Sequence, residues 1–459
     1  MTTFYDLKIA RNLNGSRIKW DFGEYIEKEL WYIWNQDEIQ KIQLLEEHGW
    51  FPYEENHPIM KLEMNILPIL AMMELEWVHI NKSKLVEIWN ELSEKITQHE
   101  WEIFELVGER FNINSPKQIQ YILFEKLNIP HAKKNKTGYS VDNEVLEYIA
   151  EKYDIARIIL EYRSLSKLKS TYIEWLLKSI HPSTGKIHTN YQQTGTSTGR
   201  VSSDNPNLQN IPTGQWYGER IKSCFLPSPG NIFIVADYSQ IELRILAHLS
   251  KDINLVDAFI QWEDIHTRTA RFIFGESTIT SEMRRVAKSV NFWVIYGITG
   301  FWLSKTIGRS PTEANAYIDT FYKTYPWVRS YYDNILEWAH SNGYVETLFQ
   351  RRRYIPGIND ANKLIRQWAE REAMNMPIQW TAADVLKYAM IAIEKQFKEK
   401  KLLSKMILQV HDELVFDVPK EEKTTVETII RNCMQWVLTG DVPILVDIHH
   451  GDNWQDAKG

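Results

Sequence analysis

The sequence predicts a mixed protein of the α/β (α+β) class, in which long helical stretches flank a small number of strands. Residues 62–180 and 255–375 carry apolar side chains mainly at intervals of three and four, the spacing of amphipathic helices. Two apolar runs, "NIFIVADYSQ" (231–240) and "SKMILQVHDELVFDVP" (404–419), have the length and composition of buried strands. A chain of 459 residues is long enough for several lobes around a large core.

Local signals place the helical elements and one long loop. "INSPKQIQYILFEKL" (113–127) predicts a capped helix, with Ser115 as the N-cap and Pro116 at the first helical position. "TGTSTGRVSSDNPNLQNIP" (194–212) is polar and rich in turn residues. Such a segment is too long for a simple connection, which indicates a functional loop.

The predicted strands carry carboxylates at their ends. Asp237 lies near the end of the first strand, and a helix is expected to begin directly afterwards at "IELRILAHL". Asp412 follows His411 at the turn between the two strands of 404–419. If the two carboxylates converge, their oxygens could bind hard cations such as Mg²⁺. Spacing alone leaves the alternative that they are two unrelated strand-end aspartates.

Composition excludes several classes of protein. Hydrophobic residues make up 44% of the chain, no apolar run reaches the length of a membrane span, and the N-terminus lacks the basic-then-apolar pattern of a signal peptide. With only two cysteines, Cys224 and Cys433, we expect no disulfide scaffold and a cytoplasmic location. The net charge of −7 does not indicate nucleic-acid binding. Phosphates respond to local basic patches such as "RRRY" (351–354), although solvated surface charge explains such a patch equally well.

The helix expected at 282–297 has one chemically distinctive face. Arg284, Lys288, Phe292 and Tyr296 recur at every fourth residue and therefore share that face. Two cations followed by two aromatic rings suit a triphosphate at one end and a base with its sugar at the other. The alternative is a basic amphipathic helix on the protein surface.

Three segments together resemble the polymerase motifs of the family A (polymerase I-like) DNA polymerases. They are "DYSQIELRILAHLS" (237–250), "RRVAKSVNFWVIYG" (284–297) and "QVHDELVFD" (409–417). The resemblance extends over roughly residues 62–459. It implies a right-hand fold with a helical thumb, helical fingers and an antiparallel palm sheet. It also implies a monomeric DNA-directed DNA polymerase that binds primer–template DNA, dNTPs and two Mg²⁺ ions.

The resemblance assigns catalytic and metal-binding roles to four residues. Asp237 and Asp412 would be the metal-binding carboxylates, with the backbone carbonyl of Tyr238 as a further ligand. Glu413 would lie beside the primer end. A further four residues, which would follow the primer–template near its end, are Arg200, Asn375, Gln379 and His411.

The resemblance also implies a nucleotide-binding set. Its members would contact the triphosphate, the sugar or the base of the incoming nucleotide: Gln240, Glu242, His266, Arg284, Lys288, Phe292 and Tyr296. Within it, Arg284 and Lys288 would hold the triphosphate and Phe292 would pack on the sugar. Glu242 matches the steric gate that excludes a ribose 2′-hydroxyl.

Domain boundaries follow from the same resemblance. We expect a thumb at 62–205, a palm formed by 206–255 and 376–459, and fingers at 256–375. Residues 1–61 would be the vestige of a missing exonuclease domain. Its "DFGE" lacks the Asp-x-Glu spacing of a proofreading site, so proofreading and 5′-nuclease activities are expected to be absent.

Tryptophan occupies several positions at which the family usually has glycine. Average usage would give roughly 32 glycines, whereas the chain has 20 Gly and 18 Trp. The positions concerned are Trp77, Trp262, Trp293, Trp302, Trp327 and Trp380. One hypothesis is that UGA codons meant as glycine were translated as tryptophan. The other is real substitution, and Gln350, at another usual glycine, shows that such positions vary.

Two other functions share part of this pattern. A single-subunit RNA polymerase has related palm motifs, but Glu242 and "TGRVSS" (198–203) argue against it. A DNA-binding homologue that no longer catalyses is also possible, since Trp293 leaves it open. It is disfavoured by four intact residues, Asp237, Asp412, Arg284 and Lys288.

Overall fold

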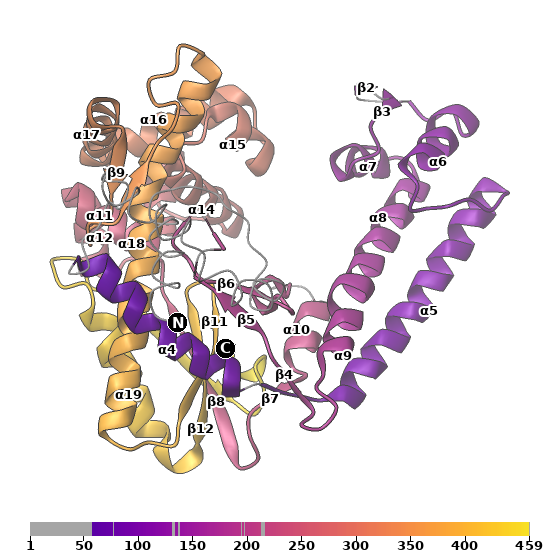
Figure 1. Ribbon diagram of the computed structural model, residues 1–459. Coiled ribbons are helices and arrows are strands. Elements are labelled where there is room, and N and C mark those ends of the chain that lie inside the picture. Colours follow the sequence, from indigo (N-terminus) through magenta and orange to yellow (C-terminus); the bar gives the residue numbers. More distant parts are fainter. Residues whose placement is uncertain are drawn as a thin grey trace, which may run out of the picture. The chain divides into compact units, whose positions relative to one another are not determined.

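The computed structural model describes residues 57–76, 78–130, 134–135, 138–193, 195–196, 198–212 and 216–458. Trp77 and residues 1–56, on which most of the predicted exonuclease vestige falls, lie outside these ranges. The chain divides into two compact units, and each is described by itself. Figure 1 labels their helices and strands.

The first unit, residues 57–76, 190–204 and 230–450, is built on a four-stranded sheet in the order β11-β12-β8-β13. The central strand β12 pairs antiparallel with β11 and with β8. Residues 232–236 are buried without alternation, as expected for a strand covered on both faces. The strands predicted from the two apolar runs are thereby confirmed. The predicted strands are β8 (Asn231–Tyr238), β11 (Lys405–Val410) and β12 (Glu413–Pro419), and the sheet also contains β13 (Val446–Gly451).

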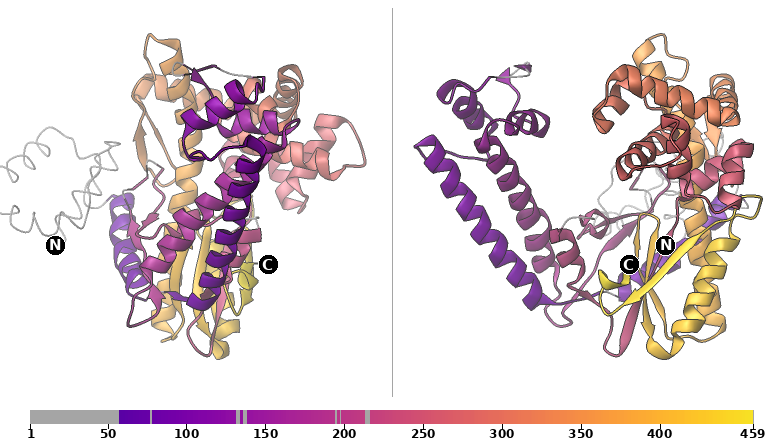
Figure 2. Two further views of the ribbon diagram at one scale, coloured as in Figure 1. Left: turned by 90° about the vertical axis from the view of Figure 1, so that its right-hand side faces the viewer. Right: turned by 180° about the vertical axis from the view of Figure 1, so that it is seen from behind.

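Three helices lie beside this sheet. The long α18 (Lys363–Glu399) packs against α19 (Lys423–Trp436) and also against α4 (Pro58–Glu76), which contacts β11. Figure 2 shows α19 running alongside the strands when the unit is seen from behind. Their apolar side chains belong to one large core that continues into the helices described next.

Seven helices follow β8 in the chain and belong to the same unit. The predicted helix at 282–297 is confirmed as α14, which begins after Thr280, whose side chain accepts a hydrogen bond from Met283 N. Its buried face consists of Val286, Ala287, Val290, Asn291, Val294 and Ile295. The helices are α11 (Ile241–Ser250), α12 (Ile253–Ile260), α13 (Ile265–Phe274), α14 (Ser281–Ile295), α15 (Gly300–Ile307), α16 (Pro311–Thr324) and α17 (Pro326–Asn342).

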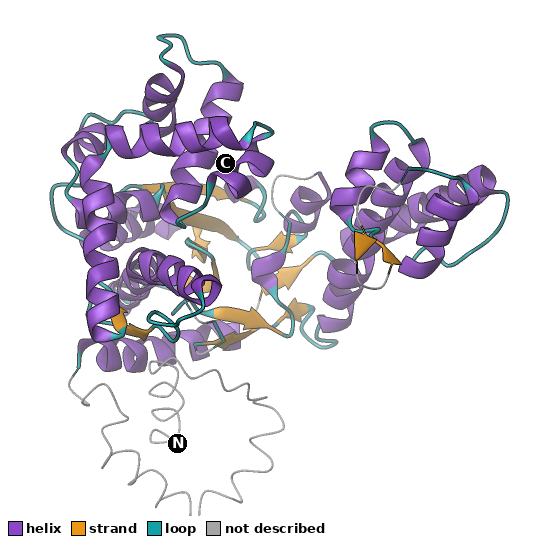
Figure 3. Ribbon diagram, turned by 90° about the horizontal axis from the view of Figure 1, so that it is seen from above, coloured by secondary structure: helices purple, strands orange, loops and turns teal. Residues whose placement is uncertain are grey.

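Two antiparallel hairpins also belong to this unit. β5 (Asn190–Gln192) pairs with β6 (Ser202–Asp204), and β9 (Tyr344–Glu346) pairs with β10 (Arg352–Tyr354). Figure 3 shows the strands of the chain in orange and its helices in purple.

The second hairpin corrects the interpretation of "RRRY" as a surface basic patch. Arg351 is 2% exposed and Arg353 is 8% exposed. Each is neutralised inside the protein, Arg351 by Glu63 and Asp384, and Arg353 by Glu372. Buried guanidinium groups require such partners, because an unpaired charge is costly in the interior.

The second unit, residues 78–189, 205–229 and 451–458 among those described, is mainly helical. α5 (Lys82–Val107) and α8 (Asp154–Lys167) run side by side (Figure 1). The predicted cap is confirmed: Ser115 accepts a hydrogen bond from Gln118 N, and Pro116 begins α6. A three-stranded sheet, β4-β1-β7, lies at one end of the helices.

The remaining elements of this unit are short. They are β1 (Val78–Ile80), α6 (Pro116–Gln120), β2 (Lys134–Asn135), β3 (Gly138–Tyr139), α7 (Asn143–Ala150), α9 (Glu174–Ser179), β4 (Lys186–Ile187), α10 (Trp216–Lys222) and β7 (Phe225–Leu226), with π-helical turns at Tyr121–Lys126 and Leu168–Ile173 and 3-10 turns at Leu208–Asn210 and Asp456–Lys458. In the part of the chain that the structure describes, no helix combines the length and apolarity needed to span a membrane.

Candidate active site

The two aspartates singled out in the sequence lie at the same end of adjacent strands. Asp237 on β8 is opposite Glu413 on β12, and the backbone N–H of Tyr238 donates to the carbonyl oxygen of Asp412 at 3.3 Å. His411 has a φ of +55° and forms the turn that places Asp412 there. The register of two antiparallel strands therefore brings the backbones of Asp237 and Asp412 close together.

This pair fits a magnesium site that is completed by substrate. Among the residues described, there is no group of three or more His, Cys, Asp or Glu side chains that could hold a metal by themselves. Mg²⁺ is usually held by one or two carboxylates together with water and substrate phosphate oxygens. Asp412 is half-buried, with a side chain 30% exposed, so its oxygens remain accessible to such a substrate.

Arg200 links Asp412 to the first turn of α11. Its Nη2 lies 3.0 Å from Oε1 of Glu242 and 3.5 Å from Oδ1 of Asp412. Burial raises the pKa of Glu242 and the nearby Asp412 adds to that, whereas Arg200 lowers it. The guanidinium therefore holds two carboxylates that would otherwise repel each other.

The other oxygen of Glu242 is bound by the end of α14. Tyr296 donates its hydroxyl to Oε2 of Glu242 at 2.9 Å. Two residues of α18 also contact Tyr296: Asn375 Nδ2 donates to its carbonyl oxygen at 3.5 Å, and the Gln379 side chain hydrogen-bonds to its hydroxyl. Gln240, with a φ of +54°, is the N-cap of α11 and lies two residues before Glu242.

The rest of the predicted α14 face is open. Arg284, Lys288 and Phe292 are exposed, and the rings of Phe292 and Tyr296 lie 4.8 Å apart between centroids. Two cations and two rings thus follow one another along the helix, as the four-residue spacing predicted.

Asp264 is a site residue that sequence reasoning missed. It is the N-cap of α13 and also pairs with Arg284, whose Nε lies 2.6 Å from Oδ2. Although burial opposes ionisation, hydrogen bonds from Arg284 and Thr267 lower the pKa of Asp264 to about 2. The pattern Asp264-Ile-His266-Thr267 at a helix start was the available signal, because an aspartate before a helix is a common N-cap.

His266, in the first turn of α13, is a buried and neutral side chain that faces α14. Its pKa is lowered from 6.5 to about 4, mainly by burial and also by Arg284 and Lys288, although Asp264 raises it. Its Nδ1 is 2.9 Å from Nδ2 of Asn291 on the buried face of α14.

A family model described as DNA polymerase family A matches residues 82–456. The chain belongs to DNA polymerase family A. Curated relatives include DNA polymerase I of Bacillus subtilis, 48% identical over 401 residues, and that of Caldicellulosiruptor bescii, 46% identical over 399 residues. These alignments cover 87% and 86% of this chain but 46% and 47% of the relatives, so the chain spans about half their length.

A solved structure supports the same family A assignment. It is the polymerase domain of Pol1 from M. smegmatis in complex with DNA primer–template and dNTP. It is 36% identical, with a TM-score of 0.82 over 86% of this chain and 70% of that one. The predicted fold class, a polymerase fold that combines helices with an antiparallel sheet, is confirmed.

Within this family A fold, Trp262 occupies a backbone position suited to glycine. Its φ is +58° and its side chain is 68% exposed. It follows the C-cap Gln261 of α12, Trp262 N donates to Phe259 O, and Glu263 N donates to Ala258 O. This pattern is the Schellman ending of a helix, in which the left-handed residue is usually glycine.

The other described tryptophans at family glycine positions have helical backbones. Trp302 and Trp327 are about half-exposed, and Trp380 is buried beneath Arg353. Trp293 packs against Phe292 and Tyr296, with ring centroids 5.4 Å and 5.9 Å away. Whether these positions are encoded as glycine stays a hypothesis.

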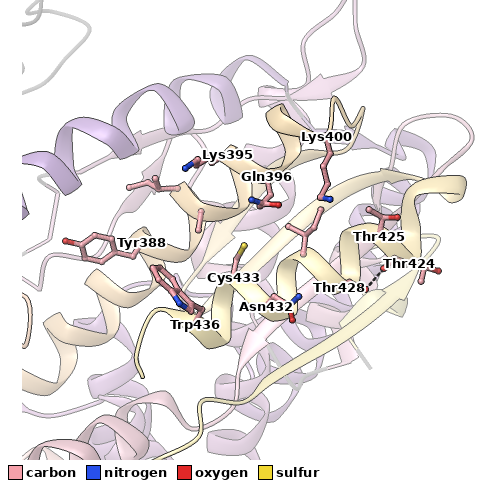
Figure 4. A pocket seen from close by; sticks show the side chains of 13 residues that line it. Tyr388, Lys395, Gln396, Lys400, Thr424, Thr425, Thr428, Asn432, Cys433 and Trp436 are labelled. Atoms are coloured by element: carbon pink, nitrogen blue, oxygen red, sulfur yellow. Dashed lines mark hydrogen bonds between the residues drawn. The ribbon is translucent and has the colours of Figure 1, made fainter. Parts of the chain in front are cut away.

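A groove of about 870 Å³ lies between α18 and α19 (Figure 4). Its lining includes Tyr388 and Lys395 from α18, and Thr428, Cys433 and Trp436 from α19. None of the predicted site residues lines it, so it is not part of the candidate active site.

Proposed function

We propose that the chain is a DNA-directed DNA polymerase that extends a primer 3′-hydroxyl with dNTPs by two-metal nucleotidyl transfer. The observation that carries the proposal is the connection from Asp412 through Arg200 and Glu242 to Tyr296. It joins the end of the sheet, where a metal would be held, to the helix that presents cations and rings. Family membership supports the same conclusion, as does the structural relative described as bound to primer–template and dNTP.

Asp237 and Asp412 would hold two Mg²⁺ ions, with the carbonyl oxygen of Tyr238 as an additional ligand. When bound, such ions activate the attacking oxygen and stabilise the leaving phosphate oxygen. Glu413 is opposite Asp237 in the register and would lie beside the primer end. Two carboxylates that converge there would favour divalent cations.

The triphosphate would be bound by Arg284 and Lys288. Arg284 already binds Asp264 through two nitrogens, a geometry that also suits phosphate oxygens. A triphosphate would therefore compete with Asp264 for the guanidinium. His266 and Gln240 complete the proposed nucleotide-binding set.

The sugar and the base would lie along the remainder of α14. Phe292 offers an exposed ring for the sugar, and Tyr296 would move with the helix near the templating base. Glu242, fixed by Arg200 and Tyr296, would stand where a ribose 2′-hydroxyl would need space. This arrangement would select deoxynucleotides.

Primer–template DNA would be followed by Arg200, Asn375, Gln379 and His411. Arg200 Nε and Asn375 Oδ1 are buried and have no hydrogen-bond partner among the described residues. Buried polar atoms normally have partners, and these two would bind DNA only after their side chains move. His411 is exposed at the turn beside Asp412.

Further parts of the proposal rest on the sequence. The predicted thumb, palm and fingers boundaries belong to it, as do a monomeric state and a cytoplasmic location. "DFGE" lacks the spacing of a proofreading site. We therefore propose that a mismatched primer end persists in Mg²⁺ when dNTPs are withheld, and removal of that end by the purified chain would contradict this.

One assay separates the three candidate functions. Primer extension with Mg²⁺ and either dNTPs or rNTPs is expected to proceed with dNTPs and to be poor with rNTPs. Efficient extension with rNTPs would favour an RNA polymerase, and binding of primer–template without any extension would favour the impaired homologue.

A further inference from the structure

Four charged side chains form a network inside the first unit that the proposed catalysis does not use. Glu63 comes from α4, Arg351 precedes β10, and Asp384 and Lys387 come from α18. All four are buried, with 0–2% of each residue exposed. Charges are retained at such depth only when they are fully paired.

The contacts within the network are close and complementary. Arg351 Nε donates to Asp384 Oδ1 at 2.8 Å, and its Nη2 donates to Glu63 Oε1 at 2.5 Å. Lys387 Nζ donates to the same Glu63 oxygen at 2.5 Å. Although burial would raise the pKa of Glu63, Lys387 and Arg351 lower it to about 2, so the carboxylate is ionised.

The network touches both ends of the segment that leads to Arg200. At one end, Gln193 Nε2 donates to the second oxygen of Glu63 and to its backbone carbonyl, both at 2.9 Å. At the other end, Arg351 is the nearest neighbour on the side of Gly199 where a side chain would point: a methyl group added there would be 3.6 Å from its Cδ and Nε. Gly199 has a φ of +70°, a conformation that glycine adopts without strain.

We propose that Arg351, held by Glu63 and Asp384, is a positioning residue that fixes the backbone at Gly199 and thereby the side chain of Arg200. Arg200 follows directly and must reach both Glu242 and Asp412. Arg200 has a long side chain that loses much rotamer freedom when it is fixed. If the backbone at Gly199 is already ordered, fixing the side chain of Arg200 costs less entropy.

Arginine suits this position better than lysine. Its planar guanidinium contacts Glu63 and Asp384 at once while presenting its side to Gly199, which a single ammonium group cannot do. Arg351→Lys therefore keeps the positive charge but loses the geometry. Arg352→Lys is the matched control, because Arg352 is the adjacent arginine, is half-exposed and pairs with Glu346.

The proposal rests on the proposed function only in its kinetic test. Arg351→Lys is expected to slow single-turnover dNTP incorporation about tenfold in the parent chain and to have little further effect in an Arg200→Ala background, because coupled residues are non-additive. Gln193→Ala removes the hydrogen bonds to Glu63 but leaves Arg351, Glu63 and Asp384 in the chain. It should show the same non-additive pattern with a smaller loss of rate. Arg352→Lys should leave the rate unchanged.

A second readout needs no catalysis. In the free protein, hydrogen exchange of the amides at 198–203 should speed up in Arg351→Lys and Gln193→Ala, with no change on α14 and none in Arg352→Lys. Equal rate losses in both backgrounds, or unchanged exchange at 198–203, would overturn the positioning role. If the parent chain incorporates no dNTP, the proposed function fails, and the exchange result alone decides this inference.

Discussion

The hydroxyl of Tyr296, at the end of α14, donates a hydrogen bond to Glu242 in the first turn of α11. The hydrogen bond ties the helix that would close on a nucleotide to the residue that would reject a ribose. Sugar selection and movement of α14 are therefore expected to be coupled through Glu242.

Removing the carboxylate of Glu242 should relax sugar selection. Glu242→Ala would remove the side chain proposed to exclude the 2′-hydroxyl and would release Tyr296, so incorporation of ribonucleotides relative to deoxynucleotides should rise at least about tenfold, a loss of roughly 1.4 kcal/mol of discrimination. Competing rNTP and dNTP incorporation measures the ratio. Glu282→Ala, an exposed carboxylate in the first turn of α14, is the control, and an unchanged ratio in Glu242→Ala would remove the residue from the sugar site.

Stability should fall with acid because of His266. In the folded chain its pKa is about 4, below the ordinary 6.5. Between these two values the unfolded chain binds a proton at this histidine that the folded chain does not bind. The contribution of His266 to the free energy of unfolding is fully present above pH 6.5 and is lost as the pH falls toward 4, by about 2 kcal/mol at pH 5. Urea unfolding of His266→Gln should show a smaller pH dependence between pH 7.5 and 5. His449→Gln, at an exposed position, should behave as the parent, and identical slopes in all three would contradict the assignment.

Glycine should stabilise the chain at position 262. A side chain in the left-handed region costs roughly 1–2 kcal/mol, and Trp262 is mostly exposed and loses little packing when removed. Trp262→Gly should therefore raise the free energy of unfolding by about 1 kcal/mol. Trp302→Gly, also exposed but helical, should instead lower it by about 1 kcal/mol. A loss of stability in Trp262→Gly would show that the indole is accommodated there.

Trp293 should slow nucleotide incorporation. Its indole packs on both Phe292 and Tyr296, and an overpacked site typically costs about 1–3 kcal/mol when its neighbours must rearrange. Trp293→Gly is expected to accelerate single-turnover incorporation at least several-fold, even though glycine within a helix lowers stability by roughly 1 kcal/mol. Equal or faster incorporation by the tryptophan form would mean that the indole belongs in the site.

Much of the site could be predicted because its signals are local. The four-residue spacing of Arg284, Lys288, Phe292 and Tyr296 defines one helix face, and strand patterns placed Asp237 and Asp412 at strand ends. The family resemblance supplied the remaining roles.

Other features depend on contacts between distant segments. Glu63 and Arg351 are 288 residues apart, and nothing in "RRRY" distinguishes a buried guanidinium from a surface one. The pairing of Arg284 with Asp264 likewise depends on how α13 packs against α14. The left-handed backbone at Trp262 could not be read from the tryptophan, which rarely adopts it, and the only signal was the glycine that the family usually has there.

The central claim is that Asp237 and Asp412 support nucleotidyl transfer, and single-turnover extension of a primer–template with dNTP and Mg²⁺ tests it most directly. Asp237→Ala and Asp412→Ala are compared with Asp447→Ala, an exposed aspartate on the neighbouring strand β13. We expect extension to be abolished in the first two variants and retained in the third, with primer–template binding little changed in all, because binding relies on phosphate contacts. Two-metal catalysis without one of these carboxylates should be far slower than about a tenth of the parent rate. Extension at about a tenth of that rate or faster, by either Asp237→Ala or Asp412→Ala, would contradict the account.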